Sequence, residues 1–342
     1  MHQEADSVPL SVDPSCRRRS QGTEVMEQGV HFRTWCKHDR ADVIILDDAG
    51  VRMRCVRLEP EQSGYFSGVD EAGAAGDRYQ YRFDESPLWP DPASCYQPDG
   101  VHGPSMVVDA TSFVWTDESW SQPALSDLVI YELHVGAFTP HGTFRSAIER
   151  LPHLVALGVT AIELMPIADF PGERNWGYDG VMLYAPARTY GAPDDLRALV
   201  DAAHAHGLAV ILDVVYNHLG PDGNYMGVYH DGYYAQPDAR RPGAPHSITR
   251  QRRCVPSFVK TCPTGCGIFI STVFVWMPPT RFWTIRAGTF SRRSRNWCRQ
   301  TAASSLPRMS ATNRSFYCPR NPAVSDLTGS GLTIFTTLFA SI

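Results

Sequence analysis

The sequence predicts an α/β protein in which an N-terminal β-sandwich of immunoglobulin-like type precedes an incomplete (β/α)8 TIM barrel. From Gly29 onward, short stretches alternate apolar and polar residues, which is typical of antiparallel strands. Residues 194–207 carry apolar side chains at helical spacing and lead into a buried apolar strand at 209–215, which is the repeating unit of a barrel. The 342 residues suffice for such a barrel, typically ~250 residues, and a smaller domain.

The N-terminal region divides into an extension and a β-rich module. Residues 1–27 are polar and lack periodicity, so we expect a disordered extension. The β-sandwich is expected over residues 29–115. Its strands are predicted at 30–35, 41–46, 51–58 and 79–83. Such a module can be purely structural or can bind a glycan, and the sequence leaves both roles open.

Proline and glycine are concentrated between residues 90 and 104, in the phrases Pro-Asp-Pro-Ala-Ser and Gln-Pro-Asp-Gly-Val-His-Gly-Pro. At this density neither a helix nor a central strand is expected. We therefore expect an ordered linker here.

The first part of the catalytic barrel is expected over residues 116–240. Thr143 is a candidate N-cap for a helix from Phe144 to Leu157, which Gly158 ends. The barrel strands are predicted at 128–136, 159–166 and 209–215. The active site of such a barrel lies at the C-terminal ends of its strands.

Candidate site residues follow the strand at 209–215. Asp213 is the single carboxylate of that run, and Asn217 and His218 come directly after it. Carboxylate, amide and imidazole groups can bind the hydroxyl groups of a sugar. The structural alternative is that Asp213 pairs with a buried arginine and that His218 is an ordinary loop residue.

The loop after the preceding strand, residues 169–190, is long and rich in aromatic residues and glycine, as functional loops of barrels often are. Trp176 and Tyr178 lie in it. A flat aromatic ring suits the apolar face of a sugar, although both rings could instead only pack the loop.

Composition and patterning bound the class of protein. Hydrophobic residues make up 43% of the chain, and no run approaches the ~20 apolar residues of a membrane span. No apolar stretch of the signal-peptide kind follows the N-terminal arginines, so we expect a cytoplasmic protein without membrane contact. The nine cysteines are odd in number and lack paired C-x-x-C spacing, which argues against a disulfide framework.

The charge pattern breaks near residue 240. Residues 241–342 contain 14 of the 31 basic residues but only one, Asp326, of the 36 acidic residues. Such asymmetry can indicate a nucleic-acid-binding domain. The arginines, however, are scattered among Pro, Thr, Ser and Cys, so we expect no nucleic-acid partner.

Several phrases of residues 29–233 resemble the malto-oligosyltrehalose trehalohydrolase family, within the α-amylase superfamily of glycoside hydrolases. Asp-Val-Val-Tyr-Asn-His (213–218) resembles the first signature region of the superfamily. Four further phrases make the resemblance specific: Tyr-Glu-Leu-His-Val-Gly-Ala-Phe-Thr (131–139), Glu-Leu-Met-Pro-Ile-Ala-Asp-Phe-Pro-Gly (163–172), Asn-Trp-Gly-Tyr-Asp-Gly-Val (175–181) and Asn-His-Leu-Gly-Pro-Asp-Gly-Asn-Tyr (217–225).

The resemblance implies a retaining hydrolase that cleaves the α-1,4 bond next to the trehalose end of malto-oligosyltrehalose or a related α-glucan. It implies that Tyr178 stacks on a sugar, that His218 binds its hydroxyl groups, and that Asp213 braces the site from beneath. It implies no metal and no cofactor. The alternatives are a 1,4-α-glucan branching enzyme or a non-catalytic glycan-binding protein.

The catalytic carboxylates that the resemblance implies fall beyond residue 240, where only Asp326 is acidic. Trp and Met have single codons, so Trp276-Met277 is TGG-ATG, and reading one base earlier allows Leu-Asp. The same shift over residues 272–280 permits Gly-Phe-Arg-Leu-Asp-Ala-Thr-His, the family's nucleophile motif. Motifs for the acid/base and the stabiliser are likewise permitted over 306–315 and 330–337. We therefore predict that residues 241–342 are an out-of-frame tail and that this chain is inactive.

Overall fold

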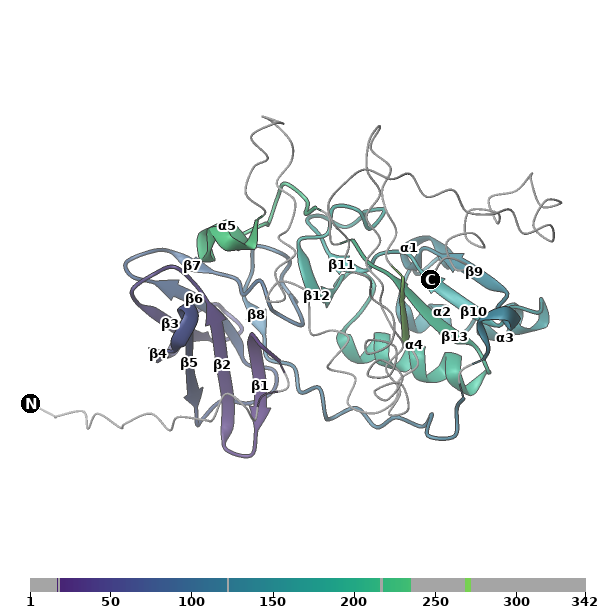
Figure 1. The fold of residues 1–342 in the computed structure, drawn as a ribbon, viewed down its shortest axis with the longest axis horizontal. Coiled ribbons are helices and arrows are strands. Elements are labelled where there is room, and N and C mark those ends of the chain that lie inside the picture. The colour runs from purple at the N-terminus through teal and green to yellow at the C-terminus, as the bar shows by residue number, and fades with distance from the viewer. Residues whose placement is uncertain (1–16, 18, 122, 216–217, 235–267, 272–342) are drawn as a thin grey trace, which may run out of the picture.

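The computed structural model describes residues 17, 19–121, 123–215, 218–234 and 268–271. Figure 1 shows two parts, a β module and an α/β part that contains helix α4. We use the name β module for residues 22–106. Within the described residues, no helix is both long and apolar enough to cross a membrane.

The β module is an antiparallel arrangement in the order β1-β2-β5-β4-β3-β6-β7, with β8 also paired to β6. Residues 52–58 of β4 pair with β3, while Glu59 and Pro60 pair with β5, so β4 joins the two halves. The immunoglobulin-like sandwich remains a prediction. The strands are β1 (Gly22–Met26), β2 (Gly29–Trp35), β3 (Ala41–Leu46), β4 (Arg52–Pro60), β5 (Tyr65–Asp70), β6 (Arg78–Phe83), β7 (Leu88–Trp89) and β8 (Ser105–Met106).

Part of the predicted disordered extension is ordered. Strand β1 pairs with β2 from Gly22 opposite Arg33 to Met26 opposite Gly29, so the prediction of disorder over 1–27 is wrong for this stretch. The turn depends on Gly29, whose φ is +89° and where a Cβ atom would lie 2.1 Å from the carbonyl oxygen of Asp70. Polar composition misled because β1 is an edge strand, where polar side chains are tolerated. Residues 1–16 lie outside the described residues.

The α/β part contains a parallel sheet in the order β14-β13-β10-β9. Its first three strands in the chain confirm those predicted at 128–136, 159–166 and 209–215. Strand β14 falls within the predicted out-of-frame tail, and the rest of that tail lies outside the described residues. An incomplete barrel remains a prediction. The strands are β9 (Ile130–Leu133), β10 (Ala161–Leu164), β13 (Ala209–Asp213) and β14 (Ile268–Ser271).

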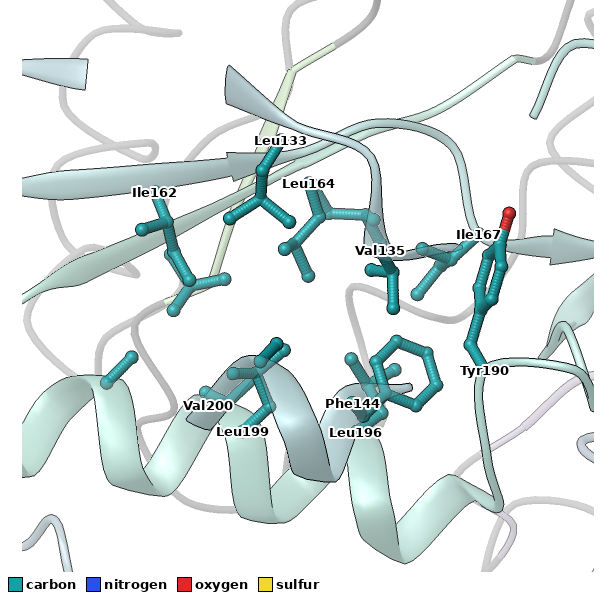
Figure 2. Close-up of a cluster of buried hydrophobic side chains, with 14 of the residues drawn as sticks. Leu133, Val135, Phe144, Ile162, Leu164, Ile167, Tyr190, Leu196, Leu199 and Val200 are labelled. Atoms are coloured by element: carbon teal, nitrogen blue, oxygen red, sulfur yellow. The ribbon is translucent and has the colours of Figure 1, made fainter. Parts of the chain in front are cut away.

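Helix α4 (Pro193–Ala205) covers one face of this sheet and confirms the helix predicted before the third strand. The Asp195 carboxylate accepts a hydrogen bond from the backbone N–H of Ala192 at 2.9 Å, which satisfies one donor before the first turn. Figure 2 shows Leu199 and Val200 of α4 directed at Ile162 of β10. This apolar layer is what holds the helix against the sheet.

The single helix predicted from Phe144 to Leu157 is wrong, because two short helices occupy that segment: α2 (Phe144–Ile148) and α3 (Leu151–Ala156). Pro152 explains the break, since it has no N–H to donate and its ring clashes with the carbonyl four residues earlier. Thr143 caps α2 as predicted, with its side chain accepting from the Ser146 N–H at 3.2 Å.

The remaining elements are short. They are η2 (Gln62–Gly64), η3 (Leu125–Asp127), α1 (Val135–Phe138), β11 (Ala168–Asp169), β12 (Met182–Pro186), α5 (Met226–Tyr229) and η4 (Asp231–Tyr233). Strands β11 and β12 pair antiparallel and frame the long loop that follows β10.

Candidate active site

One face of the parallel sheet carries three carboxylates. Glu163 of β10 lies opposite Glu132 of β9 and opposite Ile211 of β13 in the parallel register. Asp213 comes two residues after Ile211 and therefore shares its face. The alternate residues, among them Leu164 and Leu212, face the apolar layer on the other side. The face away from α4 is thus acidic.

Glu163 is the most deeply buried of these three carboxylates. Its side chain is fully buried, and within the described part of the chain neither carboxylate oxygen has a hydrogen-bond partner. Burial, reinforced by the charges of Glu132 and Asp213, raises the pKa of Glu163 to about 7. Sequence reasoning missed this residue. The available signal was a lone carboxylate within an apolar strand. It lies on the same face of the sheet as Asp213 of β13.

Asp213 lies at the C-terminal end of β13 and is 1% exposed. It lines a small cavity of about 30 Å³ together with Pro166, Gly177 and Leu212. That volume holds a water molecule but no sugar ring. The carboxylate therefore lies beneath the loop that follows β10.

The loop after β10 is fixed directly above that cavity. Gly177 has a φ of +100°, and a Cβ atom there would lie 2.5 Å from the carbonyl oxygen of Pro166. The Asn175 side chain accepts a hydrogen bond from the Gly177 N–H at 2.7 Å. The Asn175 carbonyl lies 2.7 Å from Nε2 of His134, just after β9. These contacts hold the loop over the strand ends.

The structure brings Tyr178 and His218 together. Nε2 of His218 lies 2.8 Å from the carbonyl oxygen of Tyr178, and the Gly220 N–H donates to the Gly180 carbonyl at 3.3 Å. Burial first, and then the negative charges of Asp213, Glu132 and Glu163, raise the pKa of Tyr178. The charges of the acidic face thus act on the phenol of Tyr178.

Trp176 behaves differently from its neighbours. It is 78% exposed, so its ring is not packed within the loop. Asn217, the fifth predicted site residue, lies outside the described residues. The chain segments that the structure describes contain no group of three or more His, Cys, Asp or Glu side chains arranged to hold a metal ion.

This chain is similar to known proteins of the α-amylase family. Residues 105–238 match the family model "Alpha amylase, catalytic domain". A crystal structure of a Salmonella typhimurium protein described as an alpha amylase superposes with a TM-score of 0.62 at 40% identity, covering 68% of this chain and 38% of that one. These matches confirm the resemblance to the α-amylase family of glycoside hydrolases.

The particular relatives are malto-oligosyltrehalose trehalohydrolases. That of Deinococcus radiodurans is 57% identical over 209 residues, 60% of this chain and 33% of the relative. That of Saccharolobus solfataricus is 48% identical over 219 residues, 63% of this chain and 38% of the relative. A 1,4-alpha-glucan branching enzyme GlgB of Corynebacterium jeikeium is 30% identical over 243 residues. The chain thus spans well under half the length of the relatives it matches.

Proposed function

We propose that the gene encodes a retaining glycoside hydrolase that releases trehalose from malto-oligosyltrehalose. The observation that carries the proposal is the contact between His218 and the Tyr178 carbonyl, at the ends of the strands that bear Asp213 and Glu163. This contact supports the proposal because it joins the loop that carries the aromatic Tyr178 to the imidazole of His218, and Asp213 is a buried carboxylate at the end of β13. The relatives with 57% and 48% identity support the choice of substrate.

In this proposal the residues have distinct tasks. Tyr178 stacks on the sugar at the cleaved bond, His218 binds its hydroxyl groups, and exposed Trp176 extends the aromatic surface toward further sugar units. Asp213 lies too deep to touch the reacting carbon and braces the loop from below. The retaining reaction also needs a nucleophilic carboxylate and a carboxylic acid, which neither Tyr178 nor His218 can replace.

We further propose that residues 241–342 are read out of frame and that this polypeptide is inactive. The single acidic residue beyond 240 and the motifs permitted by the shifted codons support this. The nucleotide sequence across codons 230–245 tests the frame directly. A single-base insertion or deletion there is expected, and an uninterrupted frame shared with the relatives' genes would contradict it.

The activity test compares this chain with a frame-restored gene product on malto-oligosyltrehalose. We expect trehalose from the restored protein and none from the chain as written. New α-1,6 branches in a linear α-glucan would instead identify a branching enzyme, which the relative at 30% identity makes the second candidate. Glycan binding without turnover by the restored protein would identify a non-catalytic binding protein.

A further inference from the structure

We propose that the β module is a positioning element for the candidate site, and that Tyr229 is the residue through which it acts. Residues 218–234 follow the third barrel strand, and we call them the anchored loop. One end of the anchored loop carries His218, and the other end is built into the hydrophobic core of the β module. Figure 1 shows α5 of this loop against the β module.

Tyr229 is the deepest contact. Its side chain is fully buried, and its ring centroid lies 4.7 Å from that of Phe83 and 5.9 Å from that of Tyr81, both on β6. Its hydroxyl donates to the carbonyl of Pro90 at 2.9 Å, and its carbonyl accepts from the Lys37 N–H at 2.9 Å. The loop therefore contributes a core residue that the module's own strands do not supply.

Trp35 at the end of β2 makes a second contact with the loop. Its ring stacks on His230 at a centroid distance of 3.9 Å and meets Tyr233 edge-on at 5.0 Å. A Cβ atom at Gly232 would lie 2.6 Å from Cη2 of Trp35, so the backbone itself packs on the indole. Because these aromatic contacts have specific geometry, they fix the backbone path of the loop as well as burying its side chains.

The loop's other end is fixed to the loop after β10. His218 reaches the Tyr178 carbonyl, and a Cβ atom at Gly220 would lie only 2.3 Å from the Asp179 carbonyl oxygen. Between the two ends, the Tyr225 hydroxyl lies 2.5 Å from Nδ1 of His102 in the β module. Short irregular segments lose order readily unless such contacts offset the entropy of fixing their backbone.

The anchored loop is thus held between the β module and the Tyr178 segment. Loss of the module contact should loosen the loop and allow His218 to leave Tyr178. That His218 and Tyr178 bind sugar rests on the proposed function, whereas the anchoring does not. The anchored loop covers this surface of the β module, which gives the module a structural role.

Hydrogen–deuterium exchange of the full 342-residue chain, without any sugar, tests the inference. Tyr229→Leu should speed exchange of a peptide covering 218–225 by about tenfold or more. The substitution leaves a cavity and removes the hydrogen bond to the Pro90 carbonyl. Peptides from β3 and β6 should change much less. Tyr229→Phe keeps the ring and should restore most of the protection.

Tyr79→Leu is the matched control. Tyr79 is equally buried in the same cluster and donates to Asp91, and its described ring contacts are with Phe32 and Tyr81. If it loosens 218–225 as much as Tyr229→Leu does, the effect is general destabilisation and the proposal fails. Unchanged exchange at 218–225 in Tyr229→Leu would also overturn it.

A milder variant covers the case in which Tyr229→Leu does not fold. His230→Ala removes the stack on Trp35 and the hydrogen bond that Nδ1 of His230 accepts from the Gly232 N–H at 2.8 Å, and it should speed exchange at 218–225 by roughly threefold. No change there, in a chain that is otherwise native, counts against the proposal. Because trehalose release is not measured, failure of the proposed function leaves these outcomes unaffected.

Discussion

Glu163 lies directly opposite Glu132 in the parallel register of β10 and β9, so two carboxylates of the same charge face the same side of the sheet. Only Glu163 is fully buried. Burial and the neighbouring negative charge both favour a proton bound to Glu163. The pH dependence of stability should therefore report on this residue.

We expect Glu163→Gln to remove a loss of stability at neutral pH. The folded-state pKa of Glu163 is about 7, whereas an unfolded glutamate titrates near 4.3, so the folded chain binds the extra proton between these values. The unfolding free energy is therefore highest below about pH 4 and falls as pH rises through 7. At pH 8 the variant should be more stable by up to about 3 kcal/mol.

Urea unfolding at pH 5 and pH 8 measures this difference. Glu149→Gln, at an exposed position, is the control and should leave the pH dependence as it is. An identical fall in stability in Glu163→Gln and in the unsubstituted chain would show that another group carries the proton.

Gly177→Ala should destabilise the chain by more than Gly158→Ala. Both glycines have positive φ, +100° and +83°, but only at Gly177 would the new Cβ meet an atom closely, the Pro166 carbonyl oxygen at 2.5 Å. Gly158→Ala measures the backbone penalty alone, about 1–2 kcal/mol. Thermal unfolding of the two variants isolates the steric part. Equal losses would mean that the loop does not hold its position over Pro166.

Leu199→Ala should cost about 2–5 kcal/mol of unfolding free energy, because Leu199 is fully buried in the layer between α4 and the sheet. Leu157→Ala removes the same atoms from a side chain that is 62% exposed and should change stability by less than about 0.5 kcal/mol. Denaturant midpoints at constant slope provide the measurement. Similar costs for both would argue against α4 packing on this face.

In the frame-restored protein, His218→Ala should lower kcat/KM for trehalose release by about tenfold, the effect of losing one or two neutral hydrogen bonds. Its circular dichroism should match that of the unsubstituted protein. His206→Ala, on the exposed end of α4, should retain full activity. Full activity of His218→Ala would remove the imidazole from the proposed site.

The sequence predicted best where hydrophobic period and burial agree. Ala209–Asp213 is a continuous apolar run with one carboxylate, and it is a fully buried strand. The prediction was wrong where a single residue interrupted a segment whose apolar residues have helical spacing. Pro152 falls within an apolar pattern of helical spacing, yet its missing N–H divides the segment into α2 and α3.

The candidate site was predicted only in part, for a different physical reason. Asp213 and His218 could be placed because Asp213 ends a strand and His218 follows it. Their relation to Tyr178 depends on the fold bringing two loops together. Glu163 was not predicted as a site residue. Its place beside Glu132 and on the face of Asp213 depends on the register between strands, and the sequence of one strand does not specify that register. Strand β1 was missed because its partner, rather than its own composition, orders it.

The anchored loop also constrains the order in which the chain can mature during synthesis. The β module is made first, but Tyr229 and Tyr233 belong to its core and emerge from the ribosome only after strands β9, β10 and β13 of the parallel sheet. Until then the module has an apolar opening beside Trp35 and Phe83. Contacts this distant in sequence form slowly, so the nascent module is expected to need shielding until the parallel sheet has begun to assemble.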